Sequence, residues 1–211
     1  TDRNDPVTAR FCVLAVGCLS SANRPAFENL AKFKGQQFHT GEWPHEGVDF
    51  TGQDVGVIGT GSSAIQSVPL IARQASSLTV FQRTANYSIP AWNSKMDAQY
   101  QNSIKADYPA LRAQARGRPS GVMFPFNFQP ALEPLEEERD KIYQEFWDRG
   151  GLPFLGAFSD LLFDAKANET AAEFARNKIK EIVKDKTTAE LLCPKNVFGC
   201  KRLCVDSGYF E

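Results

Sequence analysis

The sequence predicts an α/β fold with one β-α-β unit and a long helical insertion after it. Residues 53–81 run from an apolar, β-rich stretch through a glycine turn into a helix-like segment and then into a second β-rich stretch. Residues 94–192 are charged and carry apolar side chains at helical spacing. A right-handed crossover would make the two strands parallel neighbours in one sheet.

The N-terminal part is expected to contribute one more strand. Residues 10–17 (RFCVLAVG) form an apolar, partly β-branched run that stops at Gly17, which is typical of a buried strand. Residues 19–52 are rich in Ser, Asn, Pro and Gly with isolated aromatic residues. They predict a long, irregular connection, and such loops in compact domains are usually functional.

The β-α-β unit is recognised by its change of periodicity. Residues 54–59 (DVGVIG) predict the first strand, residues 65–75 (IQSVPLIARQA) a helix and residues 78–81 (LTVF) the second strand. The apolar positions that repeat at helical spacing are Ile65, Val68, Leu70, Ile71 and Ala75.

Two amphipathic helices are expected in the insertion, over residues 133–149 and 169–184, with a break at residues 116–134 where Gly and Pro interrupt any helix. Their apolar stripes are Leu135, Ile142, Tyr143, Phe146 and Trp147 in the first and Phe174, Ala175, Ile179, Ile182 and Val183 in the second. Residues 151–163 (GLPFLGAFSDLLF) are unusually apolar for a loop. A role in the core is favoured over a pocket cover or a docking surface.

Composition excludes several classes of protein. The 211 residues include 24 Lys and Arg against 25 Asp and Glu, so the net charge of −1 argues against a general nucleic-acid or anionic-membrane binder. No membrane span or signal peptide is visible. Five cysteines, an odd number, fit reduced thiols in the cytoplasm better than a disulfide framework. Zinc at Cys193, Cys200 and Cys204 is disfavoured because the only histidines are His39 and His45. A metal site at these two histidines is disfavoured as well.

The glycine turn predicts dinucleotide binding. Residues 59–64 (GTGSSA) fit G-x-G-x-x-[GA] between a strand and a helix, the pattern of a Rossmann-like three-layer domain. The first glycine permits the tight turn, the second lets the backbone approach a pyrophosphate, and the helix N-terminus offers free N–H groups. The motif residues expected to bind the cofactor are Gly59, Thr60, Gly61, Ser62 and Ser63. The alternative is a glycine turn whose serines only cap the helix.

The end of the second strand favours NADP(H) over NAD(H). An NAD site usually has an acidic residue about 20 residues after the motif, to accept the ribose 2′-hydroxyl. Here that position is Arg83, and residues 78–84 contain no acid. A guanidinium beside the hydroxyl of Thr84 suits a 2′-phosphate.

A second motif precedes the turn. Residues 33–44 (FKGQQFHTGEWP) resemble F-x-G-x-x-x-H-x-x-x-W-[PD], the fingerprint of the Baeyer–Villiger monooxygenases, and residues 80–93 (VFQRTANYSIPAWN) and 198–203 (FGCKRL) are also similar to that family. The fingerprint positions are Phe33, Gly35, His39, Trp43 and Pro44. Trp43 favours this family over the related N- and S-oxidising flavin monooxygenases. From the residues alone, His39 is interpreted as a polar anchor in a linker that moves when NADP binds.

The resemblance implies an enzyme in which NADPH reduces FAD, reduced flavin takes up O₂ as a C4a-peroxide, and the peroxide inserts oxygen beside a ketone carbonyl to give an ester or lactone. It assigns the 2′-phosphate to Arg83, Thr84 and Lys201 and the essential catalytic arginine to Arg202. A permanent cation there would stabilise an anionic peroxyflavin.

Only one nucleotide fingerprint is present, and the chain opens at Thr1 without a Met. It is therefore interpreted as the NADPH-binding domain of an enzyme more than twice as long, inactive by itself, whose partners are a ketone, O₂ and the FAD-binding domain of the same polypeptide. The expected divisions are a strand and loop returning from the FAD domain (1–19), the NADP-binding core with its fingerprint loop (20–93), the helical insertion (94–192) and a return segment (193–211).

Three alternatives stay open. They are an N- or S-oxidising flavin monooxygenase, a stand-alone NADP-binding module, and an NADPH-dependent disulfide or quinone reductase. The last needs a close C-x-x-C, and Cys200 and Cys204 miss that spacing.

Overall fold

The computed structural model describes residues 6–19, 21–118 and 120–211. The chain divides into two units, Thr1–Asp49 and Phe50–Glu211, which are described separately here. The division falls inside the expected range 20–93, because the connection that carries the fingerprint belongs to the first unit and the β-α-β unit to the second.

The first unit has little regular structure. Its described residues form two short 3₁₀ helices, η1 (Leu30–Lys32) and η2 (Thr40–Glu42). The strand expected over residues 10–17 is wrong: these residues form no strand, and side chains such as Phe11 and Val13 are largely exposed. A strand needs an adjacent strand to pair its N–H and C=O groups, and no described residue pairs with this run.

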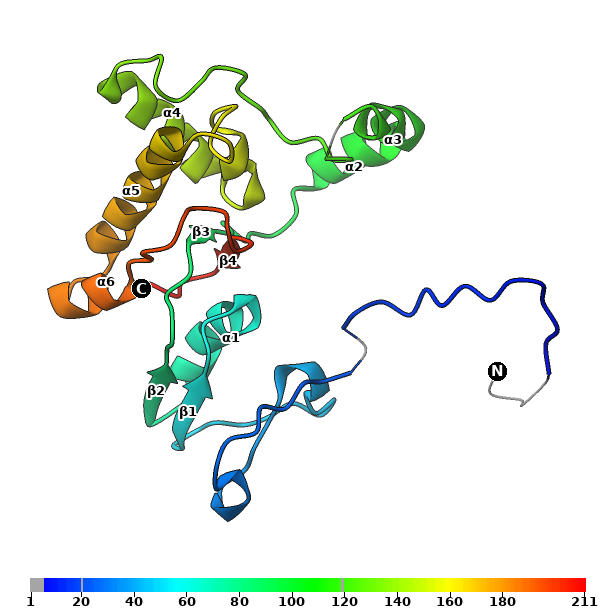
Figure 1. Ribbon diagram of the computed structural model, residues 1–211, viewed down its shortest axis with the longest axis vertical. Coiled ribbons are helices and arrows are strands. Elements are labelled where there is room, and N and C mark those ends of the chain that lie inside the picture. The colour runs from blue at the N-terminus through cyan, green and yellow to red at the C-terminus, as the bar shows by residue number, and fades with distance from the viewer. Residues whose placement is uncertain (1–5, 20, 119) are drawn as a thin grey trace. The chain divides into compact units, whose positions relative to one another are not determined.

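The predicted β-α-β unit is confirmed (Figure 1). β1 (Asp54–Ile58) and β2 (Ser77–Phe81) are parallel and in register from Asp54 opposite Ser77 to Ile58 opposite Phe81. α1 (Ser62–Ala72) connects them and buries Ile65, Val68 and Ile71. Along both strands half-buried and exposed residues alternate, so only one face of this sheet is covered.

A second pair of parallel strands is formed by β3 (Ser88–Pro90) and β4 (Cys204–Asp206). The whole helical insertion lies between these two strands in the sequence, so the C-terminal tail returns to the strand that precedes the insertion. The described residues thus hold two separate two-stranded sheets with helices, an α/β arrangement, rather than one continuous sheet. β4 also contacts α1, which brings the second sheet beside the β-α-β unit.

The insertion is mainly helical, as predicted. Its helices are α2 (Ala98–Ala106), α3 (Tyr108–Arg116), α4 (Glu136–Arg149), η3 (Leu152–Gly156), α5 (Ala165–Ile182) and α6 (Lys186–Leu192). Four of them begin at an aspartate whose carboxylate accepts a backbone N–H of the first turn, namely Asp97, Asp107, Asp164 and Asp185. One stripe position is wrong: Leu135 is 81% exposed, because it is the N-cap of α4 and lies outside the helical repeat.

The core is built by the insertion around aromatic rings. Tyr143 of α4 stacks on Phe154 of η3, with ring centroids 5.6 Å apart, and Phe154 contacts Phe198 of the C-terminal tail at 5.6 Å. Most of the apolar run 151–163 is core, which confirms the favoured interpretation, although Leu162 and Phe163 at its end are exposed. The tail is therefore anchored on the insertion. None of the helices in the described ranges is long and apolar enough to cross a membrane.

Candidate dinucleotide-binding site

The glycine turn has the conformation that its sequence requires. Gly59 has φ +103°, a region that residues with a side chain rarely adopt, and its N–H donates to the carbonyl of Phe81 at 2.9 Å. Gly61 is extended and forms the N-cap of α1. A Cβ built on Gly59 or on Gly61 would meet no atom within 4 Å. The turn therefore exposes its backbone at the end of β1.

The N-terminus of α1 is free to receive an anion. The N-cap has no side-chain hydrogen bond and the first turn has no acidic residue. The first helical bond of α1 is donated by the N–H of Ile65 to the carbonyl of Gly61, at 3.0 Å. Ser62 accepts a hydrogen bond at Oγ from Gln66, at 3.0 Å, instead of capping the helix. The alternative in which the serines only cap α1 is therefore disfavoured, and the positive end of the helix dipole faces open space.

The segment after β2 is tied to the turn. Thr60 is buried, its Oγ1 donates to the carbonyl of Thr84 at 2.9 Å, and its own carbonyl accepts a short hydrogen bond from Nδ2 of Asn86. Arg83 and Thr84 lie just after β2, beyond Gln82, and are exposed. The structure thus brings Thr84 to the turn, with Arg83 next to it in the sequence.

Lys201 and Arg202 precede β4 and are also exposed. The N–H of Cys204 donates to the carbonyl of Tyr87 at 3.0 Å, and Cys204 is in register with Ser88. β4, which begins two residues after Arg202, also contacts α1. Cys204, two residues after the basic pair, and Thr60 of the glycine turn therefore both hydrogen-bond to the segment between β2 and β3.

The loop before this basic pair is fixed by buried and partly buried polar contacts that the sequence did not reveal. The hydroxyl of Tyr87 contacts the carbonyl of Asn196 at 3.1 Å, and Nη1 of Arg176 donates to the same hydroxyl at 3.1 Å. Asn168 of α5 binds the backbone of Phe198. An isolated polar residue on an otherwise apolar helix face, such as Asn168, is the one signal that could have found them.

The fingerprint residues all belong to the first unit. Nδ1 of His39 accepts a hydrogen bond from the N–H of Gly41 at 3.0 Å and so caps η2, while the ring of Trp43 lies 5.8 Å from that of Phe38. A Cβ on Gly35 would come within 2.6 Å of the tip of the exposed Phe33 ring. Pro44 is half-buried. His39 therefore has a structural role in this loop.

The three late cysteines are free thiols. Cys193 and Cys204 are buried, and burial raises the pKa of both thiols, which disfavours the reactive thiolate. Cys200 is exposed. Within residues 6–19, 21–118 and 120–211, no group of three or more His, Cys, Asp or Glu side chains is arranged to hold a metal ion.

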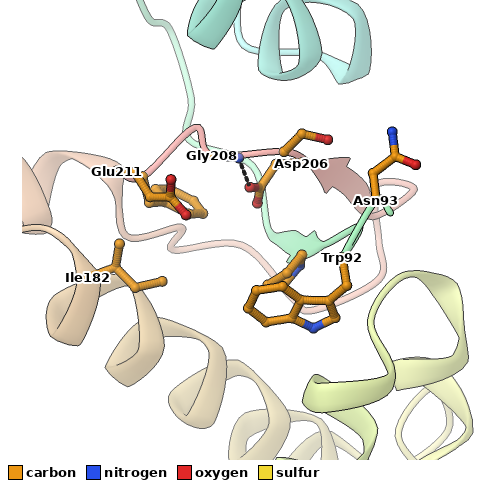
Figure 2. A pocket seen from close by; sticks show the side chains of 9 residues that line it. Trp92, Asn93, Ile182, Asp206, Gly208 and Glu211 are labelled. Atoms are coloured by element: carbon orange, nitrogen blue, oxygen red, sulfur yellow. Dashed lines mark hydrogen bonds between the residues drawn. The ribbon is translucent and has the colours of Figure 1, made fainter. Parts of the chain in front are cut away.

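A hollow of about 370 Å³ lies elsewhere, beyond the carboxyl ends of β3 and β4. Trp92, Asn93, Ile182 and Glu211 are among its lining residues, and the carboxylate of Asp206 accepts the N–H of Gly208 at 3.1 Å there (Figure 2). None of the predicted site residues lines it.

No family model matches the chain, but individual proteins do. A Baeyer–Villiger monooxygenase of Pseudooceanicola batsensis is 39% identical over the whole chain, which covers 39% of that protein. An oxidised steroid monooxygenase bound to NADP is 52% identical with a TM-score of 0.93, and a complex of OTEMO with FAD and NADP is 35% identical with a TM-score of 0.93. Both alignments include all of this chain, which corresponds to 40% of the steroid monooxygenase and 41% of OTEMO. The chain thus spans about two fifths of the length of its relatives, and the resemblance expected from the motifs is confirmed.

Proposed function

Because this chain is homologous along its whole length to Baeyer–Villiger monooxygenases, we propose that it is the NADPH-binding part of an FAD-dependent enzyme that inserts one oxygen atom of O₂ beside a ketone carbonyl. The observation that carries the proposal is the uncapped, open N-terminus of α1 behind the turn of Gly59 and Gly61. An anion is the natural occupant of such a helix end.

The residues around the turn fit NADP(H). The N–H groups of Ser62 and Ser63, together with the backbone of Gly61, would hold the pyrophosphate, and the absence of an acid in the first turn of α1 avoids repulsion. Arg83, Thr84 and Lys201 would hold the 2′-phosphate of NADP. NAD has a neutral hydroxyl at this position, which would not form a charge-assisted hydrogen bond with these cations. This assignment makes NADPH the preferred reductant. We propose a Rossmann-like layering for the domain as a whole.

Arg202 is proposed as the catalytic arginine. Its guanidinium would supply a positive charge beside the reacting groups. The contacts of β4 with α1 support this role, since Arg202 lies two residues before β4. FAD, when bound by the rest of the enzyme, supplies the chemistry that activates O₂.

The proposed partners are a small ketone, O₂ and an FAD-binding domain of the same polypeptide, in the cytoplasm. The relatives' greater length supports a further domain. Neither nucleic acid nor a membrane is proposed as a partner, because the net charge is −1 and no basic surface is implied by the composition.

The full-length protein tests this function directly. We expect flavin absorbance bands in the purified enzyme, NADPH oxidation that a cyclic ketone stimulates, and an ester or lactone that carries one atom of ¹⁸O from ¹⁸O₂. A colourless protein that still binds NADP⁺ would instead support the stand-alone module. An N- or S-oxide from amine or sulfide substrates, with no ester from any ketone, would support the related class of flavin monooxygenase.

A further inference from the structure

Asn86 touches the glycine turn without belonging to it. It lies between β2 and β3, and its Nδ2 donates a short hydrogen bond to the carbonyl of Thr60. Thr60 in turn donates from Oγ1 to the carbonyl of Thr84 at 2.9 Å. The middle residue of the turn is therefore held at both its side chain and its carbonyl by the segment that follows β2.

The amide oxygen of Asn86 indicates that the hydrogen bond to Thr60 is the main interaction of this side chain. Its Oδ1 is buried and has no hydrogen-bond partner among the described residues. A buried amide oxygen without a partner is unfavourable, and an apolar side chain of the same shape, such as leucine, would avoid that penalty. The donated bond to Thr60 is the interaction that an apolar residue could not make.

We infer that Asn86 is a positioning residue of the phosphate-binding turn. By fixing the Thr60 carbonyl it fixes the peptide plane between Thr60 and Gly61, and with it the direction in which the following N–H groups point. The inference rests on the proposed function, because it assumes that these N–H groups receive the pyrophosphate of a dinucleotide.

The role has a specific consequence for cofactor choice. The pyrophosphate is common to NADP and NAD, whereas only NADP carries the 2′-phosphate that Arg83 is proposed to bind. A residue that acts through the turn weakens both dinucleotides by the same factor. Loss of Asn86 should therefore weaken the binding of both dinucleotides. Loss of Arg83 should instead change the preference for NADP over NAD.

The test uses the full-length enzyme with Asn86→Leu, which keeps the shape of the side chain and removes the donor. We expect the Kd values of NADP⁺ and NAD⁺ to rise together by about 5- to 10-fold, the usual effect of one lost neutral hydrogen bond. The KM for NADPH rises by the same factor, while the rate of flavin reduction at saturating NADPH is unchanged. Asn102→Ala, at an exposed position of α2, is the matched control and leaves every value unchanged.

Unchanged Kd values in folded Asn86→Leu protein, with or without a lower Tm, would overturn the inference, and so would a loss confined to NADP⁺. If the leucine does not fold, Asn86→Ala, whose smaller side chain cannot clash, is held to the same two criteria. Failure of the wild-type enzyme to bind either dinucleotide would refute the proposed function itself, which separates the two outcomes.

Discussion

Asn168 of α5 and Phe198 of the C-terminal tail exchange two hydrogen bonds. Nδ2 of Asn168 donates to the Phe198 carbonyl at 2.8 Å, and its Oδ1 accepts the Phe198 N–H at 2.9 Å. Nδ2 also donates to the carbonyl of Leu161 at 2.7 Å. One buried amide thus ties the helical insertion to the loop that leads into Lys201 and Arg202.

Asn168→Ala should lower the free energy of unfolding by roughly 2–4 kcal/mol, because three hydrogen bonds are lost and buried backbone groups of Phe198 are left without a partner. Urea denaturation followed by circular dichroism measures the change. Asn177→Ala, at an exposed position of the same helix, controls for helix propensity and should cost far less. Equal losses for the two variants would show that the contact to Phe198 contributes nothing.

Gly61→Ala should separate stability from binding. Gly61 has φ −78° and no atom within 4 Å of the added Cβ, so Tm should not fall. The methyl group would occupy the space through which the pyrophosphate approaches, and NADPH binding should weaken by at least about tenfold. Gly59→Ala provides the contrast: its φ of +103° makes any side chain strained, so Tm should drop. An unchanged NADPH affinity in Gly61→Ala would count against the site.

Arg83→Ala should remove the preference for NADPH. The loss of a charge-assisted contact to the 2′-phosphate should raise the KM for NADPH by about 10- to 100-fold and leave the KM for NADH nearly unchanged. Arg73→Ala, an exposed arginine at the end of α1, is the control and should change neither. If Arg83→Ala retains the wild-type ratio of the two KM values, another residue reads the 2′-phosphate.

Arg202→Ala should uncouple the two halves of the reaction in the full-length enzyme. Steady reduction of the flavin by NADPH continues, but ester formation stops, because the permanent cation beside the reacting groups is gone. Stopped-flow absorbance and product analysis measure the two steps. Lys195→Ala removes an exposed charge from the same loop and should behave as wild type. Unchanged oxygenation in Arg202→Ala would refute the role.

Tyr143 gives the insertion a dependence on alkaline pH. Burial raises the pKa of Tyr143 to about 12, against about 10 in an unfolded chain. The phenol's contribution to stability is therefore complete below pH 10 and is lost as the pH rises from 10 through about 12. At pH 8, Tyr143→Phe should lower the free energy of unfolding by about 1 kcal/mol, because the hydrogen bond to Thr170 is lost. Between pH 8 and pH 11 the wild type should lose stability and the variant should not, so the difference between their free energies of unfolding should narrow in urea titrations. A constant difference would contradict the raised pKa of Tyr143.

Local patterns predicted the parts of the fold that local interactions build. The strands Asp54–Ile58 and Ser77–Phe81, the helix between them and the helical insertion all follow from short-range periodicity and capping, and all are present. The run at residues 10–17 has an equally clear apolar pattern but forms no strand. A strand depends on a partner as well as on its own residues, and periodicity contains no information about the partner.

The sequence by itself determined the motifs on which the proposed chemistry rests: a glycine turn at residues 59–64, an arginine where an NAD site usually has an acid, and a fingerprint that resembles that of the Baeyer–Villiger monooxygenases. The tertiary structure alone decided how these parts meet. It paired β3 with β4 across the whole insertion and gave Asn86 and Asn168 their partners. The reason is physical. A motif's residue types follow from the ligand they bind, whereas contacts between distant segments depend on how buried polar groups and aromatic rings are satisfied when the chain packs.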